Sequence, residues 1–263
     1  MLGNLFGIRK NVDRKTSITI STLAFVILFG VWSLASVLHL ADESMLPTPW
    51  AVFGFIIKSF ADGSIYADMW VSIYRIVMGF IISVIIGVPL GIAIGTFKIA
   101  ECIFRPICEF VRYMPVPAFL PLVMMWVGIG EEAKIGVILL GTLFQMILMV
   151  MDDALLVSND LLNSGYTLGA NKFQVLCKIL IPAMMPKLMD TLRILMGWAW
   201  TYVTVAELVA ANSGLGYSIM KAQRFLQTDA VYAGILIIGF LGLIFDRLFA
   251  LCNKKLFHWV EGA

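Results

Sequence analysis

Charged side chains are scarce in this sequence. Only 14% of the 263 residues are Asp, Glu, Lys or Arg, whereas 60% are hydrophobic. A soluble domain carries about 25% charged residues, because it must cover a surface that faces water. The composition therefore predicts that lipid is the main solvent of the chain. The basic residues are spread among loops and the formal net charge is only +2, so we expect no nucleic-acid partner.

Motifs of enzymes and metal sites are missing as well. The two histidines, His39 and His258, lie far apart in the chain, and the four cysteines form no C-x-x-C pair, so we expect no metal site. The sequence has no Gly-Lys dipeptide and hence no G-x4-G-K-[ST] phosphate-binding loop, nor does it contain G-x-S-x-G or H-E-x-x-H. We identify no catalytic or cofactor-binding residue, and we do not expect the chain to hydrolyse ATP by itself.

Long uncharged runs dominate the sequence instead. A membrane-spanning helix needs roughly 20 mostly apolar residues, and several runs reach or approach this length. They are 18–38, 76–97, 113–130, 135–151, 194–206 and 230–245. The sequence therefore predicts an all-α membrane protein with six transmembrane helices.

The first of these runs, 18–38, follows a basic segment and superficially resembles a secretory signal. It is too long for the apolar core of a signal peptide, and no small-residue cleavage site follows. We interpret it as a retained first helix after a cytoplasmic segment, residues 1–17. With this segment inside, most of the 19 Lys and Arg fall on the cytoplasmic side, as the positive-inside rule requires. Six spans then place both termini in the cytoplasm.

The longest segment on that side, residues 152–190, is too apolar for a solvated linker. Leucines recur at roughly helical spacing on both sides of Gly169-Ala170-Asn171, which predicts two short helices joined by a turn. We expect Pro182 and Pro186 to end the second helix. Spacing alone does not decide whether this hairpin lies on lipid head groups or docks onto a cytoplasmic partner.

Charged residues at membrane depth are costly and need an explanation. Arg75 and Glu207 lie at similar predicted depth near the outer face, so we hypothesise that they form a structural ion pair between the second and fifth spans. The alternative is that Arg75 offers a bidentate donor to an anionic solute. Asp246 and Arg247, near the cytoplasmic end of the last span, are expected to anchor that helix at the interface.

Aromatic and hydroxyl side chains are concentrated in the run 194–206. Trp198, Thr201, Tyr202 and Thr204 are our candidates for the lining of a translocation pathway. The alternative is that the aromatic residues form an interfacial belt, although they lie nearer the middle of the membrane than its rim.

Prolines and glycines interrupt two of the predicted spans. Pro115, Pro117 and Pro121 are expected to prevent a continuous helix at the inner end of the third span. In the second span, small residues and a proline are expected to allow close helix packing. These are Gly87, Pro89, Gly91 and Gly95.

A spaced pattern occurs within residues 152–190. Gly169, Ile179 and Pro182 read G-x9-I-x2-P, which resembles the core of the EAA loop in permease subunits of binding-protein-dependent ABC importers. Further motifs resemble the nitrate, sulfonate, taurine and bicarbonate branch of that family. They are S-x2-R-x3-G from Ser72, P-L-G from Pro89, P-x-P-x3-P from Pro115, W-x-G-x-G-E from Trp126, A-E from Ala206, G-L-G-Y from Gly214 and G-x3-D-R from Gly242. The resemblance covers about residues 68–260.

The resemblance implies a type I ABC importer permease architecture, in which residues 68–260 form the permease core with five further transmembrane helices. It implies a subunit of a bacterial inner membrane that forms the translocation pathway for a small polar or anionic solute, such as taurine, another sulfonate or nitrate, by alternating access. The implied partners are a second permease copy in a homodimer, two ATP-binding cassette subunits that use the ATP, and an external solute-binding protein. An ATP-independent secondary transporter or channel is the alternative, although no half-chain repeat is apparent.

The resemblance also assigns residues 152–190 as a cytoplasmic coupling loop, which in relatives inserts into the ATPase subunit at the position of residues 163–173. Its residues are Asn163, Ser164, Gly165, Leu168, Gly169, Ala170, Asn171, Phe173, Ile179 and Pro182. Asn163-Ser164-Gly165 departs from the usual Glu-Ala-Ala, which removes an acidic residue and weakens the helix with a glycine. Contacts made by that glutamate therefore do not carry over.

Overall fold

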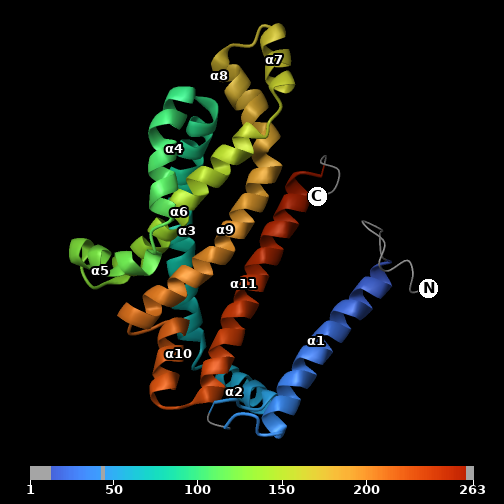
Figure 1. Ribbon diagram of the computed structural model, residues 1–263, viewed down its shortest axis with the longest axis vertical. Helices are drawn as coiled ribbons and strands as arrows, with labels where there is room; N and C mark the ends of the chain where they lie inside the picture. Colours follow the sequence, from blue (N-terminus) through green and yellow to red (C-terminus); the bar gives the residue numbers. More distant parts are fainter. Residues whose placement is uncertain (1–12, 43–44, 259–263) are drawn as a thin grey trace. The chain divides into compact units, whose positions relative to one another are not determined.

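The computed structural model describes residues 13–42 and 45–258. These residues form helices and turns, and no strand occurs among them (Figure 1). The predicted all-α class is confirmed. The chain divides into two compact units, one of residues 1–62 and 222–233 and the other of residues 63–221 and 234–263.

The first unit contains two complete helices among the described residues, α1 (Arg14–Val37) and α2 (Pro49–Ala61). Helix α1 covers almost all of the predicted first span, whereas most of the predicted segment 1–17 lies outside the described residues. Thr48 caps α2, because its side chain accepts a hydrogen bond from the backbone N–H of Ala51 at 3.2 Å. The indole of Trp32 donates to the carbonyl of Pro47 at 3.0 Å, which fastens the turn between the helices.

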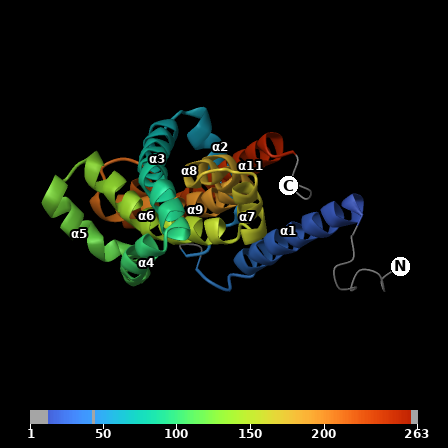
Figure 2. The same ribbon diagram turned by 90° about the horizontal axis from the view of Figure 1, so that it is seen from above.

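The rest of the chain forms nine α-helices and a π-helix among the described residues. They are α3 (Tyr66–Thr96), α4 (Lys98–Arg112), α5 (Val116–Val127), α6 (Glu131–Leu155), α7 (Asn159–Thr167), α8 (Lys172–Val175), the π-helix η2 (Leu176–Leu180), α9 (Ile181–Ala210), α10 (Leu215–Arg224) and α11 (Thr228–Leu256). Helices α3, α6 and α9 lie together in both views, and α5 projects to one side (Figures 1 and 2). Within the second unit, α7 and α8 lie at one end and the start of α10 at the other.

Glycines let α3 and α6 approach closely. A Cβ added at Gly91 would lie 2.7 Å from the Cβ of Val150, and one added at Gly95 would lie 2.8 Å from the Cβ of Ala154. The same seam continues with Gly79 against Ile138 and Gly87 against Met146. The predicted close packing is therefore confirmed, and Pro89 lies inside α3 without ending it.

The bounds predicted for the third span, 113–130, are wrong. The chain breaks at residues 113–115, and α4 and α5 meet there at 103°. Of the three prolines, only Pro115 coincides with the break, because Pro117 lies in the first turn of α5 and Pro121 lies inside it. A first-turn N–H has no partner within the helix, so a proline there removes no hydrogen bond.

Within residues 13–42 and 45–258, four helices are long and apolar enough to cross a membrane, namely α1, α3, α6 and α11, and the bent pair α4–α5 gives a fifth candidate. The predicted fifth span, 194–206, lies within α9. That helix carries Lys187, Asp190, Arg193 and Glu207. It is not among the helices whose length and apolar composition would let them cross a membrane. A count of six spans remains a prediction.

The expected helix end at Pro182 and Pro186 is also wrong. Helix α8, the π-helix η2 and α9 follow one another without a break, with Pro182 at the start of α9 and Pro186 inside it. A proline ring clashes with the carbonyl four residues earlier, which for Pro182 belongs to Lys178 within the wider π-helix. The π-turn therefore gives the ring the room that a regular helix would lack.

The predicted turn between two short helices is present. Gly169 has φ +85°, a left-handed conformation that glycine adopts without strain at the end of a helix. Asn171 begins α8 with a capping box, since its side chain accepts from the N–H of Gln174 and the Gln174 side chain accepts from the N–H of Asn171, both at 2.9 Å.

Candidate functional site

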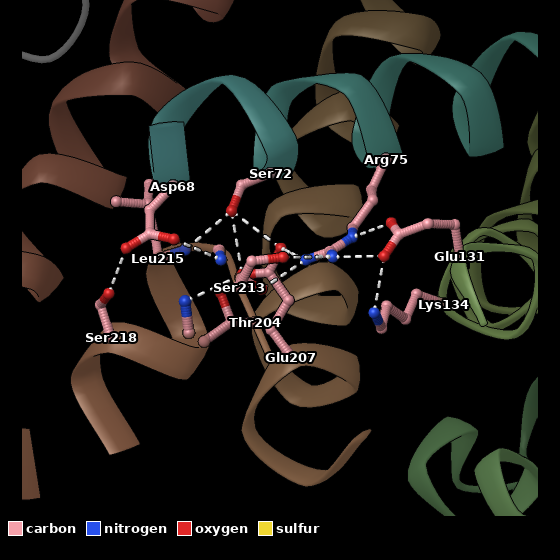
Figure 3. Close-up of polar contacts among 12 residues, drawn as sticks. Asp68, Ser72, Arg75, Glu131, Lys134, Thr204, Glu207, Ser213, Leu215 and Ser218 are labelled. Atoms are coloured by element: carbon pink, nitrogen blue, oxygen red, sulfur yellow. Dashed lines mark hydrogen bonds and ion pairs between the residues drawn. The ribbon is translucent and has the colours of Figure 1, made fainter. Parts of the chain in front are cut away.

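Arg75 and Glu207 are buried together between α3 and α9 (Figure 3). Their side chains are 0% and 1% exposed, and Nη1 of Arg75 lies 2.7 Å from Oε1 of Glu207. Ser72, one turn before Arg75, donates to the same carboxylate at 2.8 Å. The structure therefore brings together the two residues whose pairing was hypothesised from the sequence.

Every N–H donor of Arg75 has a partner. Nε and Nη2 bind the carboxylate of Glu131 at 2.5 and 2.7 Å, while Nη1 and Nη2 donate to the carbonyl and hydroxyl of Ser213 at 2.8 and 3.2 Å. With the bond to Glu207, these contacts use all of the roughly five donors of a guanidinium. Lys134 donates to Glu131 at 2.7 Å, so two cations face two carboxylates. We call these residues, with Ser72, the Arg75 cluster.

Two residues of this cluster, Ser72 and Glu207, cap the N-terminus of α10 together with Asp68. The backbone N–H of Gly214 donates to Asp68 at 2.7 Å, that of Leu215 to Ser72 at 2.9 Å and that of Gly216 to Glu207 at 2.8 Å. Ser218 also donates to Asp68. The first N–H groups of a helix lack partners within it and favour negative charge. These side-chain oxygens therefore accept the hydrogen bonds that the first turn of α10 cannot form internally, and the N–H groups in turn hold the carboxylates in place.

Two glycines make this close approach possible. Gly214 has φ +109°, and a Cβ there would overlap the carboxylate of Glu207. At Gly216 a Cβ would lie 2.8 Å from the Cβ of Glu207 and 2.9 Å from the carbonyl of Thr204. The motif that begins at Gly214 is therefore explained by its contact with a buried carboxylate.

The arrangement fits a structural role better than solute binding. Arg75 lies in α3 and has no donor left over, and its partners come from α6, α9 and the segment between α9 and α10. The sequence analysis found Glu207 but missed Glu131, although Glu131 belongs to the motif that begins at Trp126. Counting the donors of a guanidinium against one carboxylate would have shown that a second acceptor was needed.

The α7–α8 loop presents apolar side chains at its tip. Leu168 is 89% exposed and Phe173 is 72% exposed. Gly165 is buried against the second helix, where a Cβ would overlap Cδ1 of Ile179. An open hollow is lined by Asp160, Asn163, Ser164, Thr167 and Leu168. The two short helices thus support an exposed tip with polar surroundings.

The candidate pathway residues do not share one environment. Trp198 and Tyr202 line a cavity of about 280 Å³ between α4, α5, α6 and α9. Thr204 donates to the carbonyl of Trp200 at 2.8 Å within its own helix. Thr201 is exposed and is not among the residues that line the cavity. Only Trp198 and Tyr202 are therefore brought together at one cavity.

Polar pairs that the sequence analysis missed lie toward the other end of α9. Asp153 of α6 accepts from Thr191 at 2.6 Å, and Arg193 binds Asp246 of α11 at 2.5 and 2.6 Å. Asp246 thus contacts a neighbouring helix, whereas only anchoring at the interface was expected of it. Among residues 13–42 and 45–258, no group of three or more His, Cys, Asp and Glu side chains is placed to hold a metal ion.

The fold and its buried charges define a helical membrane protein that crosses the bilayer several times. A family model described as "Binding-protein-dependent transport system inner membrane component" matches residues 87–258. The chain belongs to this family, and its function is that of an ABC transporter permease, as the sequence predicted.

Relatives extend the similarity to nearly the whole chain. The chain is 31% identical to the taurine transport system permease protein of Escherichia coli, over 94% of this chain and 91% of that one. It is 30% identical to a putative aliphatic sulfonates transport permease protein of Bacillus subtilis, over 97% and 93% of the two chains. A solved structure of the MetNI methionine ABC transporter, in an inward-facing conformation, matches with a TM-score of 0.64 and 18% identity, over 71% of this chain and 93% of that one. This match supports the predicted permease fold.

Proposed function

We propose that this chain works as a homodimer that imports a small polar or anionic solute, such as a sulfonate, taurine or nitrate. Two separate ATP-binding cassette subunits use the ATP, an external solute-binding protein delivers the solute, and this chain itself binds no cofactor. Both termini face the cytoplasm of a bacterial cell, and ATP binding switches the permease between inward-open and outward-open states. The named activities of the relatives support the solute class.

The α7–α8 loop carries this proposal. Its apolar tip, Leu168 and Phe173, is exposed in a chain whose family works with binding proteins. The loop continues without a break through η2 into α9, so a push on the tip reaches a helix that also carries Glu207. A rigid element fastened in this way transmits motion, whereas a loose linker does not. The ATPase subunit is the proposed occupant of the tip.

The Arg75–Glu207 pair is assigned the structural role in this scheme. Together with Glu131, the pair holds α3, α6 and α9 together at the end opposite the loop, while Trp198 and Tyr202 line the pathway cavity.

An affinity purification from mild-detergent extracts of native membranes tests the proposal. We expect an ATPase subunit to co-purify with the wild-type chain and to be lost from Phe173→Asp and Gly169→Asp. Phe173→Asp places a charge in an apolar contact, and Gly169→Asp strains the turn, where φ is +85°. Leu226→Asp is a matched control, because Leu226 is 81% exposed but lies between α10 and α11.

Retention of the ATPase by Phe173→Asp would contradict docking at the loop. Failure to recover any ATPase in several detergents, with solute uptake continuing in ATP-depleted vesicles, would favour the gradient-driven alternative.

A further inference from the structure

Arg112 is an exposed cation whose side chain contacts its neighbour in the sequence. It is the last residue of α4, and its Nη2 donates to the hydroxyl of Tyr113 at 3.0 Å. The guanidinium carbon lies 4.9 Å from the centroid of the Tyr113 ring. No carboxylate lies within salt-bridge distance of Arg112 in the parts of the chain that the structure describes. Its charge therefore has no anionic counterpart there.

The position of Arg112 makes this lack of a counterpart costly. Arg112 lines the same cavity as Trp198 and Tyr202, and α6 contributes Gly141 to it. At ~1.5 Å per residue, Gly141 lies about 15 Å from the start of α6 and about 21 Å from its end. Since α6 is long and apolar enough to cross a membrane, the cavity is near the middle of the bilayer. A cation at that depth costs about 2.5 kcal/mol or more and marks a functional site by default.

The cavity combines an apolar wall with a small set of polar groups. Its volume is about 280 Å³, just below the range of roughly 300–1,000 Å³ typical of small-ligand pockets. Phe144, Trp126 and Trp198 supply aromatic faces, while the polar groups are Arg112, Gln145 and Tyr202. No acidic side chain is among the lining residues, so the polar groups favour an anion.

We propose that this cavity is a solute-binding site within the permease itself, selective for a small organic anion with an apolar body. The inference rests on the proposed import function. The guanidinium of Arg112 pairs with the oxyanion group in the fork geometry that suits it, and the Gln145 amide donates to the same group. The body of the solute lies against Trp198 and Trp126, where it displaces water from apolar surface.

The consequence is that the permease discriminates among solutes in addition to the binding protein. An inorganic anion such as nitrate satisfies Arg112 but leaves the aromatic faces uncovered, so it binds more weakly than an organic anion of the same charge.

Calorimetric titration of the purified permease–ATPase complex, without the binding protein, tests this site. The probes are butane-1-sulfonate and nitrate. We expect saturable binding of butane-1-sulfonate, at least tenfold tighter than nitrate, and at least tenfold weaker binding of butane-1-sulfonate by Arg112→Gln. Arg112→Lys keeps the charge without the fork and gives an intermediate loss. Arg247→Gln is the matched control, because Arg247 is an exposed guanidinium of α11 outside the cavity, and its affinity should equal that of the wild type.

The outcomes separate the site from the proposed function. Equal affinities for the two anions, no saturable binding, or unchanged binding by Arg112→Gln would overturn the site while co-purification of the ATPase leaves the importer standing. Loss of the ATPase from every wild-type preparation would overturn the importer instead. If Arg112→Gln fails to fold, Trp198→Ala decides, because it should weaken butane-1-sulfonate tenfold and leave nitrate unchanged. Equal effects on both anions would contradict recognition of the apolar body.

Discussion

The Arg75 cluster and the α7–α8 loop lie at opposite ends of the second unit (Figure 1). The two regions differ in which side chains they bury and which they expose. In the cluster, the charged side chains of Arg75, Glu207 and Lys134 are buried, and each donor of Arg75 meets an acceptor from the same chain. In the loop, the large apolar side chains of Leu168 and Phe173 are exposed, and the hydrogen bonds are local caps such as that of Asn171.

The difference indicates that the cluster stabilises the fold, whereas the loop tip serves association with a partner. A buried charge network is costly to disturb, because the loss of one partner leaves another charge unpaired in a medium of low dielectric constant. Exposed apolar residues contribute little to the fold and are available to a partner. Mutations in the cluster should therefore lower stability, whereas mutations at the loop tip should lower association.

Removal of Glu207 is expected to have the largest effect. In Glu207→Ala, Arg75 loses one of its two carboxylates, and the N–H of Gly216 loses its acceptor. Breaking a buried ion pair in this way costs about 3–5 kcal/mol. The measurement is the thermal unfolding temperature of the purified protein in detergent, which should fall sharply.

Glu101→Ala is the control for loss of a carboxylate. Glu101 binds Lys98 and Arg105 on α4, whose side chains are 79% and 43% exposed, and such pairs contribute about 0–1 kcal/mol. Similar losses in the two variants would contradict a structural role of the cluster. An exchange of charges between Arg75 and Glu207 is not a suitable rescue, because a carboxylate at position 75 would face Glu131.

Gly214→Ala should rank second. Its φ of +109° strains an L-residue, and the new Cβ would overlap the Glu207 carboxylate. Strain of this kind costs about 1–3 kcal/mol, so the unfolding temperature should fall less than for Glu207→Ala. Gly239→Ala in α11 meets nothing within 4 Å and should be neutral or slightly stabilising, because alanine favours a helix over glycine. Equal behaviour of the two variants would break the argument.

The sequence predicted those parts of the fold and site that depend on burial and spacing. The apolar runs 18–38, 76–97, 135–151 and 230–245 predicted the four helices that are long and apolar enough to cross a membrane. The cost of charge at membrane depth led to Arg75 and Glu207. The turn at Gly169 followed from its neighbours. Each of these predictions needs only one chain segment or one pair of residues.

The predictions failed where the local structure depends on the conformation of the neighbouring backbone, or where a pair of residues needs a third partner. Pro182 removes an N–H, but whether the helix ends there depends on the π-turn before it, which no residue type indicates. The uncharged run 113–130 excludes Arg112, because it begins at the next residue, Tyr113. A search for uncharged runs excludes in advance a cation that lies within a span.

Gly165→Ala should have a smaller effect, because two terms oppose each other. Alanine gains up to about 1 kcal/mol of helix propensity over glycine. Its Cβ overlaps Cδ1 of Ile179, and overpacking costs typically 1–3 kcal/mol. The end of a flexible side chain gives way more easily than backbone, so we expect a net loss below about 1 kcal/mol. Thermal unfolding in detergent measures this loss.

The double variant Gly165→Ala/Ile179→Val isolates the steric term. Removing Cδ1 of Ile179 should turn the loss into a gain relative to Ile179→Val alone. A loss that persists in the double variant would show that the glycine is required for another reason.

Leu168→Ser should have the smallest effect on stability. Because Leu168 is 89% exposed, its loss should change the free energy of unfolding by no more than about 0.5 kcal/mol, while co-purification of the ATPase subunit falls. Leu168→Ser should therefore lower ATPase co-purification without lowering stability. Glu207→Ala should lower both, because any loss of association there follows loss of folded protein. A Leu168→Ser protein that unfolds at a lower temperature but keeps its ATPase would reverse the assignment of the two ends, since the loop tip would then serve the fold.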